Sequence, residues 1–367
     1  MVFDSDAHVE ENAETFAALA AREEFFKFSP RIFEGPTRAY WIIEGKVLPK
    51  HTGKGVFTFG TPHRPSEGEH ADAARKTPRS SQELTNPVAR LQTMDEEGID
   101  VSVVFPSLFL TYPVAEDRSF NRALCRSYNE WIAGKCTITD GRIRWAAVLP
   151  LPDISASVEE LEHAKKLGAC GFLMLGTVAD MLLDDPRLDP LYSAAERVNI
   201  PVCVHVGWAY PPLTALYDHV FRSQLSAFVL PIFIAFVSIV AGGVLDRFPK
   251  LKVGFFEAGV EWVPYWVDKI ERLHRQPPGG TLKKDLPAKF AHEYIKDGRV
   301  YFSCELDEKR IAEVVRDIGD ECILYASDLP HAHRVFSAVE LFRQRTDVSD
   351  STKEKILGKN GERFFGA

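Results

Sequence analysis

Short apolar runs alternate with longer amphipathic segments along most of this 367-residue chain. Most of the runs are almost continuously apolar, which is typical of parallel strands that are buried on both faces. We expect eight strands, at Val2–His8, Ile99–Pro106, Ile143–Val148, Cys170–Leu175, Pro201–Gly207, Leu251–Glu257, Val300–Cys304 and Cys322–Asp328. The expected helices are Pro87–Glu97, Ser119–Cys136, Ser157–Leu167, Asp189–Val198, Val260–Leu273, Glu308–Ile318 and a last one near Ser351–Phe364. This alternation predicts an α/β fold, a (β/α)8 barrel with a C-terminal helix, and a doubly wound sheet is the alternative.

One long segment falls outside this repeat. Pro30–Gln82, between the first strand and the next helix, is rich in proline, glycine, histidine and charge. Loops of this length are usually functional lids or disordered segments, and Tyr40 and Trp41 give this one apolar side chains to bury. We therefore expect a single barrel domain over 1–367, with an insertion at about 30–85 that could act as a lid.

The charge and cysteine content exclude several classes of protein. Lysine plus arginine is 44 and aspartate plus glutamate is 52, a net charge of −8, which leaves no basic stripe for a nucleic acid. The six cysteines form no CxxC pair and lie mostly in apolar runs, as in proteins of a reducing compartment. The N-terminus lacks the basic start and apolar core of a signal peptide, so we expect a cytoplasmic protein.

The stretch Ser223–Leu245 contains no charged residue and is long enough to span a bilayer. Pro231 and the Gly242–Gly243 pair weaken that interpretation. Strands of the same repeat also lie on both sides, and a membrane span would separate them. We therefore expect a buried helix and no membrane partner.

Polar side chains follow the C-terminal ends of four expected strands, where the chemistry of such a barrel lies. The first strand carries Asp6 and His8, which are two residues apart and project to the same side. Three later strands bring His205, Glu257 and Asp328 to the same rim. Imidazoles and carboxylates together suit zinc, iron or manganese better than a soft thiolate site does.

Each of these residues also has a simpler interpretation as a purely structural side chain. At His205 and Asp328 the ligand role is favoured over it. His205 stands in an apolar strand, where an imidazole needs a partner, and Asp328 follows CILYAS, where a buried carboxylate must be paired or bind a metal. Asp4 could merely brace the turn at the first strand. Cys203 beside His205 suggests a thiol nucleophile, but no second feature supports one.

Six motifs follow one another along the chain: Asp4-x-Asp6-x-His8-x-x-Glu11, Met94-Asp95-x-x-Gly98-Ile99-Asp100, Pro201-Val202-x-Val204-His205-x-Gly207, Gly243-Val244-Leu245-Asp246-Arg247-Phe248-Pro249, Glu257-x-Gly259-x-x-Trp262-x-Pro264-Tyr265 and Ser327-Asp328-x-Pro330-His331. In this order they resemble the amidohydrolase superfamily. The closer resemblance is to its branch that contains aminocarboxymuconate semialdehyde decarboxylase and γ-resorcylate decarboxylase.

The resemblance implies a metal-dependent (β/α)8 barrel whose metal ligands are Asp6, His8, His205 and Asp328. Asp328 would also exchange protons with substrate or water. Two positions depart from the family pattern. Position 6 is Asp where many members carry His or Glu, and position 257 is Glu where the decarboxylases usually carry the histidine of an HxG motif. The added carboxylate of Glu257 could complete a second metal position, so we expect one or two divalent transition-metal ions, zinc first, with iron or manganese as alternatives. The resemblance also suggests a homodimer.

Glu257 decides the reaction that the sequence favours, because an extra carboxylate can hold a second metal or orient a water nucleophile. We expect a metal-dependent hydrolase, with Asp328 and Glu257 as catalytic residues, that cleaves an ester, thioester, lactone or amide bond in an apolar or aromatic carboxylic-acid derivative. The alternative is a metal-dependent non-oxidative decarboxylase of an aromatic or muconate-type acid. A third hypothesis is a metal-free binding protein on an old barrel.

The substrate is expected to be a small molecule with apolar character. The chain has 25 phenylalanines, and although many must pack the core, those near loops could line a hydrophobic pocket. We expect Phe57, Phe109, Trp262 and His331 to contact the substrate.

Overall fold

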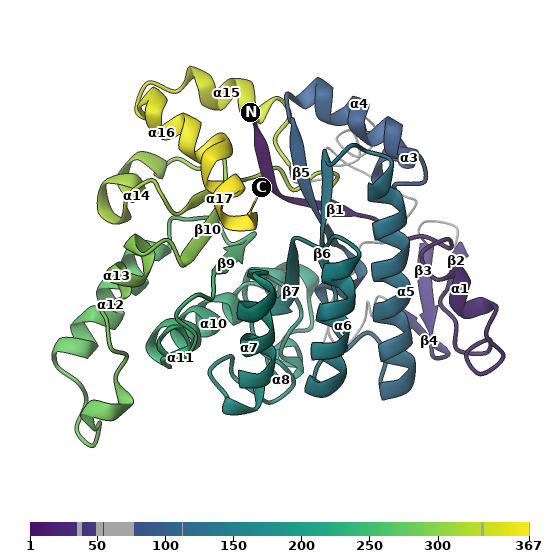
Figure 1. Ribbon diagram of the computed structural model, residues 1–367, viewed down its shortest axis with the longest axis horizontal. Coiled ribbons are helices and arrows are strands. Elements are labelled where there is room, and N and C mark those ends of the chain that lie inside the picture. Colours follow the sequence, from purple (N-terminus) through teal and green to yellow (C-terminus); the bar gives the residue numbers. More distant parts are fainter. Residues whose placement is uncertain (35–38, 49–53, 55–76, 112, 332–333, 367) are drawn as a thin grey trace.

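The computed structural model describes residues 1–34, 39–48, 54, 77–111, 113–331 and 334–366. Eight parallel strands follow one another around one sheet in sequence order (Figure 1). They are β1 (Phe3–Val9), β5 (Val101–Pro106), β6 (Ile143–Ala147), β7 (Gly171–Leu175), β8 (Val202–His205), β9 (Val253–Phe256), β10 (Val300–Glu305) and β11 (Ile323–Ala326). A doubly wound sheet would reverse its strand order at a switch point. The sequential order therefore confirms the (β/α)8 barrel.

The ring of strands is joined between β11 and β1 at their C-terminal ends. The amides of Ser327 and Asp328 donate hydrogen bonds to the carbonyl of Asp6 at 3.2 and 2.9 Å. The amide of His8 donates to the carbonyl of Leu329 at 2.6 Å. These bonds hold the residues after β11 against the first strand, so polar side chains from both strands face the same rim.

Helices alternate with the strands and cover the outside of the barrel (Figure 1). The longer ones are α4 (Pro87–Glu97), α5 (Arg118–Thr137), α6 (Ile154–Lys166), α7 (Asp189–Val198), α10 (Leu230–Ala241), α12 (Val263–Arg275) and α14 (Ile311–Ile318). The shorter ones are α1 (Ala17–Ala20), α3 (Arg79–Gln82), α8 (Pro211–Thr214), α9 (Val220–Ser223), α11 (Val244–Arg247), α13 (Ala291–Lys296), α15 (Ala338–Gln344), α16 (Asp350–Glu354) and α17 (Asn360–Phe365). Helix α4 shows how local sequence sets the ends of a helix. Asn86 caps its start by accepting a hydrogen bond from the amide of Val88, and Gly98, with φ 72°, ends it.

The C-terminal helix closes the end of the barrel opposite the polar rim. Phe365 of α17 stacks on Phe3 with ring centroids 5.9 Å apart, and Phe364 lies 6.0 Å from Phe256. Gly361 makes this approach feasible, because a Cβ there would lie 2.5 Å from Cδ1 of Phe3. The expected last helix is therefore present and packs directly on the strands.

The insertion after β1 contains a small antiparallel sheet that the sequence analysis did not predict. Its strands are β2 (Arg31–Glu34), β3 (Ala39–Ile43) and β4 (Lys46–Leu48). Trp41 of β3 is fully buried and lies edge-on to Phe16 at 5.9 Å. Phe57 lies outside the described residues, so a lid over the barrel mouth stays a prediction.

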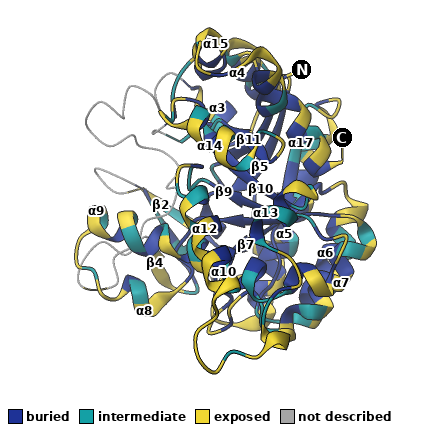
Figure 2. Cartoon of the chain, turned by 90° about the vertical axis from the view of Figure 1, so that its left-hand side faces the viewer, coloured by how far each residue is buried: buried dark blue, intermediate teal, exposed yellow. Residues whose placement is uncertain are grey.

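The uncharged stretch forms a helical segment, Val220–Ala241, between β8 and β9. Its length of 22 residues and mean hydropathy of 2.3 would allow it to cross a membrane, and half of its most apolar window is buried. Its α10 part packs on β8 and α12. The expectation of a buried helix thus fits one face: Ile232 and Phe236 are buried, whereas Leu230 and Ile234 are exposed. Figure 2 shows the mixed burial of α10 beside the fully buried strands.

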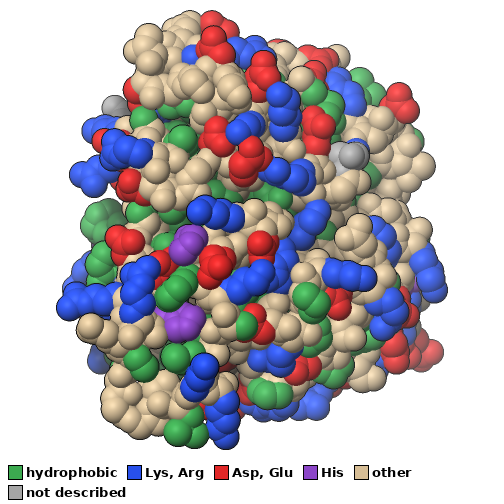
Figure 3. Space-filling view, turned by 60° about the vertical axis from the view of Figure 1, so that its left-hand side comes forward, with side chains coloured by type: hydrophobic (Ala, Val, Ile, Leu, Met, Phe, Trp, Pro, Cys, Tyr) green, Lys and Arg blue, Asp and Glu red, His purple; other side chains and the backbone are tan. Residues whose placement is uncertain are grey.

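The charges on the surface are mixed. On the face that Figure 3 shows, lysine and arginine side chains are interspersed with aspartate and glutamate. That face has no basic stripe of the kind that follows a nucleic-acid backbone.

Candidate metal centre

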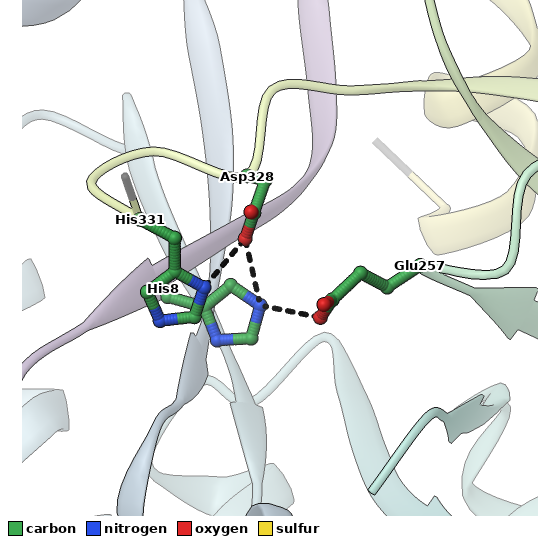
Figure 4. A group of neighbouring side chains, drawn as sticks. All are labelled: His8, Glu257, Asp328 and His331. Atoms are coloured by element: carbon green, nitrogen blue, oxygen red, sulfur yellow. Dashed lines mark hydrogen bonds and ion pairs between the residues drawn. The ribbon is translucent and has the colours of Figure 1, made fainter. Parts of the chain in front are cut away.

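Four strand ends bring five polar side chains together at one rim of the barrel. Asp6 and His8 come from β1, His205 from β8, Glu257 from the residue after β9, and Asp328 from the turn after β11. Asp6 Oδ1 lies 3.3 Å from Nε2 of His205 and 3.5 Å from Nε2 of His8. Figure 4 shows how His8, Glu257 and Asp328 point toward one another. The expected strand-end constellation is therefore present as one cluster.

The spacing of the donor atoms is close to that of metal ligands. Glu257 Oε2 is 3.4 Å from Nε2 of His205 and 3.7 Å from Nε2 of His8. Asp328 Oδ1 is also 3.7 Å from Nε2 of His8. Because zinc binds nitrogen and oxygen ligands at about 2.0–2.2 Å, neighbouring ligands of one ion stand about 3–3.5 Å apart. The donor atoms form two groups that share His8, one with Asp6 and His205 and the other with Glu257, Asp328 and His331, and within each group they lie within 4.8 Å of one another. Either group could therefore hold a divalent ion.

Several donor atoms in this cluster are buried without a hydrogen-bond partner among the described residues. Among the described residues, Asp6 Oδ2, His8 Nε2 and Glu257 Oε2 accept or donate no hydrogen bond. A buried polar atom without a partner costs about 1–3 kcal/mol, and more when it is charged. A cation between these atoms would supply the missing interaction, so the residues present fit a metal.

Both imidazoles present the nitrogen that a metal needs. Nδ1 of His8 lies 3.3 Å from the carbonyl of Pro106, and Nδ1 of His205 lies 2.9 Å from the carbonyl of Val206. A carbonyl can only accept, so each Nδ1 carries a hydrogen and each Nε2 faces the cluster. Burial would lower the pKa of His205, but Asp6 raises it to about 9, so a metal would displace a proton from its Nε2. Hydrogen bonds of this kind to the second ring nitrogen orient histidine ligands in metal sites.

The protein environment shifts the pKa values of the clustered side chains in different directions. Burial would raise the pKa of Asp6, but the neighbouring His205 and His8 hold it well below its usual range. Burial lowers the pKa of His8 to about 4, with a contribution from His331, so its ring is neutral at pH 7. Burial, and then the charge of Asp328, raise the pKa of Glu257 well above its usual value. Asp6 as an anion and His8 as a neutral ring are the forms that bind metals.

The backbone of two cluster residues is strained. Glu257 has φ 60° and Asp328 has φ 54°, in the left-handed region that costs a non-glycine residue about 1–2 kcal/mol. The strained conformations are held in place from neighbouring strands: the amide of Glu257 donates to Ser303 Oγ at 2.9 Å. Strain of this kind concentrates at functional sites.

Asp4 lies two residues before Asp6 but has a different environment. Its carboxylate is fully buried and accepts hydrogen bonds from the hydroxyls of Ser102 and Ser327, both at 2.7 Å. The amide of Ser327 donates to it as well, at 2.9 Å. Asp4 therefore ties β1 to β5 and to the turn after β11, which is the bracing role that the sequence analysis considered for it.

His331, which the sequence analysis placed among the substrate contacts, lies directly against Asp328. Its Nδ1 is 2.6 Å from Asp328 Oδ1 (Figure 4). Its Nε2 is 2.9 Å from Ser107 Oγ. The ring also stacks on His8 with centroids 4.2 Å apart. Burial would lower the pKa of His331, but Asp328 raises it to about 9.

The other predicted substrate contacts have their own surroundings. Phe109 is buried 5.4 Å from Tyr128 and lines a small apolar cavity of about 20 Å³. Trp262 packs in an aromatic group behind β9 with Phe236 and Phe255, and its Nε1 donates to the carbonyl of Gly259 at 2.8 Å. The structure therefore places both rings in packing interactions, and their contact with a substrate stays a prediction.

Two polar residues of this rim were missed by sequence reasoning. Ser107 directly follows β5 and contacts His331. Glu305 ends β10, one residue beyond the expected strand, and burial together with the charge of Asp328 raises its pKa to about 7. The signal that could have found both is their position at a strand end, since every strand of such a barrel ends at the same rim.

Comparison with known proteins places this cluster in a family context. The profile of a family described as Amidohydrolase matches residues 63–367. Among characterised proteins, the chain is 24% identical over 294 residues to 2-amino-3-carboxymuconate-6-semialdehyde decarboxylase of Dictyostelium discoideum, covering 77% of each chain. It is also 24% identical over 295 residues to gamma-resorcylate decarboxylase of Rhizobium sp. (strain MTP-10005), covering 75% of this chain and 86% of that protein.

Solved structures agree with the fold. An amidohydrolase from Mycobacterium avium subsp. paratuberculosis K-10 aligns with a TM-score of 0.77 at 20% identity and covers 100% of this chain and 99% of its own. A 5-carboxyvanillate decarboxylase of Novosphingobium aromaticivorans, in complex with manganese and 4-hydroxy-3-methoxy-5-nitrobenzoic acid, aligns with a TM-score of 0.68 at 21% identity, covering 83% of this chain and 85% of its own.

The relatives correct one expectation of the sequence analysis. The sequence favours hydrolysis because Glu257 replaces a histidine, but the two characterised proteins described above, which each match about three quarters of the chain, are decarboxylases. The physical reason for the error is that carboxylates beside a metal can serve either reaction. Glu257 alone therefore does not distinguish water activation from loss of CO2.

Proposed function

We propose that this chain, which belongs to the amidohydrolase family, is a metal-dependent decarboxylase. It would remove CO2 without oxidation from an aromatic or muconate-type acid. The observation that carries this proposal is the cluster of imidazoles and carboxylates at the rim of the barrel, with buried donor atoms that have no hydrogen-bond partner among the described residues. The names of the relatives support the choice of reaction.

The metal would be held by Asp6, His8, His205 and Asp328, with Glu257 near enough to join them. This mixture of imidazole and carboxylate suits zinc, manganese or iron. When bound, a divalent ion supplies positive charge that holds the substrate carboxylate and stabilises the negative charge that develops during the reaction.

Asp328 would carry the proton. Its carboxyl delivers a proton to the carbon that bears the substrate carboxylate, the carbon–carboxylate bond then breaks, and the bonding electrons stay with the substrate as CO2 leaves. Asp328 then regains a proton from water. Proton transfer by a positioned side chain contributes about 10²–10⁴-fold to a rate.

Glu257 would act where the related decarboxylases usually carry a histidine. Because burial raises its pKa well above the usual value, its carboxyl can carry a hydrogen and donate it to an oxygen of the substrate. Its amide is held by Ser303 Oγ, which fixes where the side chain starts.

The test is CO2 release by protein that has been loaded with zinc, manganese or iron in turn. The panel contains 2,6-dihydroxybenzoate and 5-carboxyvanillate with ring-substituted analogues of each, together with the acyclic 2-amino-3-carboxymuconate semialdehyde. We expect one CO2 per product, loss of activity on chelation, and one deuterium at the vacated carbon in D2O. Absence of CO2 from every acid of the panel with metal-loaded protein would contradict the proposal.

A further inference from the structure

The two oxygens of the Asp328 carboxylate have unlike surroundings. Oδ1 lies 3.7 Å from Nε2 of His8 and 2.6 Å from Nδ1 of His331. Figure 4 shows both interactions reaching this same oxygen. Among the described residues, Oδ2 accepts no hydrogen bond, and the side chain keeps a tenth of its surface exposed. One oxygen is therefore fixed on the metal side, and the other is left for a further partner.

We propose that His331, held by Ser107, is a positioning residue that keeps Oδ1 of Asp328 facing the metal position and so makes Oδ2 the atom that exchanges the proton with the substrate. This inference rests on the proposed function, because it assigns the proton-carrying atom within the same site.

The His331 ring is held on three sides. Its Nδ1 is 2.6 Å from Asp328 Oδ1, its Nε2 is 2.9 Å from Ser107 Oγ, and its face stacks on His8 at 4.2 Å with an interplanar angle of 26°. The hydrogen on Nδ1 donates to Asp328, and Nε2 shares a hydrogen bond with the Ser107 hydroxyl, which can donate to or accept from the ring. The ring therefore cannot turn away from Asp328 without losing both hydrogen bonds.

Ser107 is itself anchored to the first strand. Its amide donates to the carbonyl of Val9 at 3.2 Å, and the next amide, of Leu108, donates to Glu11 Oε2 at 2.9 Å. The end of β1, which carries His8, thus also places the hydroxyl that orients His331. One rigid group of strand ends sets both the metal position and the orientation of Asp328.

Loss of the Nδ1 donor would let the Asp328 carboxylate rotate and exchange its two oxygens. Partners that orient metal-site residues typically contribute 10–100-fold to activity or metal affinity. A role limited to filling space would instead depend on the size of the side chain and not on the position of its donor.

The test compares two amides at position 331. The side-chain nitrogen of asparagine can occupy the place of Nδ1, whereas that of glutamine reaches the place of Nε2. His331→Asn therefore keeps a donor to Asp328 and loses Ser107, while His331→Gln keeps contact with Ser107 and loses Asp328. We expect kcat to fall about 10–100-fold in His331→Gln, with KM nearly unchanged, and to stay within about fivefold of wild type in His331→Asn.

Ser107→Ala is a smaller change that keeps the proposal testable if a position 331 variant fails to fold. We expect it to lower kcat about three- to tenfold in the wild-type background and to have no further effect in His331→Asn, where the contact is already lost. Equal kcat values for folded His331→Asn and His331→Gln would overturn the proposal, as would an undiminished effect of Ser107→Ala in His331→Asn.

Zinc titration of the same apo proteins separates this inference from the proposed function. We expect His331→Gln to bind zinc at least about tenfold more weakly than His331→Asn, whether or not any acid is turned over. If wild type releases no CO2 from any acid, the proposed function fails, and the ratio of the two zinc affinities still decides the role of His331: equal affinities contradict it.

Discussion

Asp4 and Asp6 are two residues apart on β1 and both fully buried, yet the protein treats them in opposite ways. Asp4 accepts hydrogen bonds from Ser102 and Ser327, and burial raises its pKa to about 6. Asp6 faces His205 and His8, which hold its pKa well below the usual range, and its Oδ2 has no hydrogen-bond partner among the described residues. The comparison separates a carboxylate whose partners are all supplied by the protein from one that is left for a cation.

The largest effect is expected at Asp328, one of the carboxylates that the structure leaves for a cation. Asp328→Asn keeps the shape of the side chain but cannot carry a proton. We expect turnover to fall about 10²–10⁴-fold while the midpoint of urea unfolding changes little, measured on protein of known metal content. Turnover like that of wild type in a folded, metal-loaded Asp328→Asn protein would remove this residue from the mechanism.

The next largest effect is expected at Asp4, whose hydrogen-bond partners are all supplied by the protein. Asp4→Ala removes the acceptor for two hydroxyls and two amides, so we expect the free energy of unfolding to drop by about 3 kcal/mol. Urea unfolding in the presence of a chelator measures this loss without a contribution from metal. Ser102→Ala is the matched control and should lose about 1 kcal/mol. Metal loss without destabilisation in Asp4→Ala would erase the distinction between the two aspartates.

Much of this site could be predicted from the sequence because strand ends meet at one rim. Asp6, His8 and His205 needed only the strand pattern and the rule that parallel strands of a barrel present their C-terminal ends together. The contact of His331 with Asp328 could not be predicted, since it depends on the left-handed backbone of Asp328.

The insertion and the reaction were harder to predict for other reasons. Strands β2 and β4 have three or four residues, mostly exposed or half-buried, and carry no clear alternation of polar and apolar side chains. Trp262 packs against Phe236 of α10, a contact that depends on how α10 lies beside β9. The cytoplasmic location, the homodimer and the single-domain boundaries stay predictions of the sequence.

Metal binding should stabilise the folded protein by no more than the amount that Asp4→Ala is expected to remove. A ligand at 100 times its dissociation constant raises the free energy of unfolding by about 3 kcal/mol when it binds only the folded state, and affinity of the unfolded chain reduces this. We expect zinc to raise the unfolding midpoint of wild type and of Asp4→Ala, and to leave Asp6→Asn unchanged. Equal stabilisation of all three proteins would place the zinc elsewhere.

The smallest effect concerns Glu11, a third buried carboxyl on the same segment. Burial raises its pKa to about 8 from an ordinary value of 4.5. Its stabilising contribution is therefore complete below pH 4.5 and is lost as the pH rises through 8, because the folded chain holds a proton that the unfolded chain has released. Between pH 6 and 7, with chelator present, we expect the free energy of unfolding of wild type to fall by about 1 kcal/mol more than that of Glu11→Gln. Parallel pH profiles for the two proteins would show that Glu11 is ionised in the folded state.

The most direct test of this account is the metal content of gently purified protein. Elemental analysis is compared for wild type, Asp4→Ala and Asp6→Asn after each has been exposed to zinc and washed. The account predicts close to one divalent ion per chain in wild type and in folded Asp4→Ala, and a large loss in Asp6→Asn. Absence of stoichiometric zinc, iron or manganese from wild type, or undiminished metal in Asp6→Asn, would contradict it.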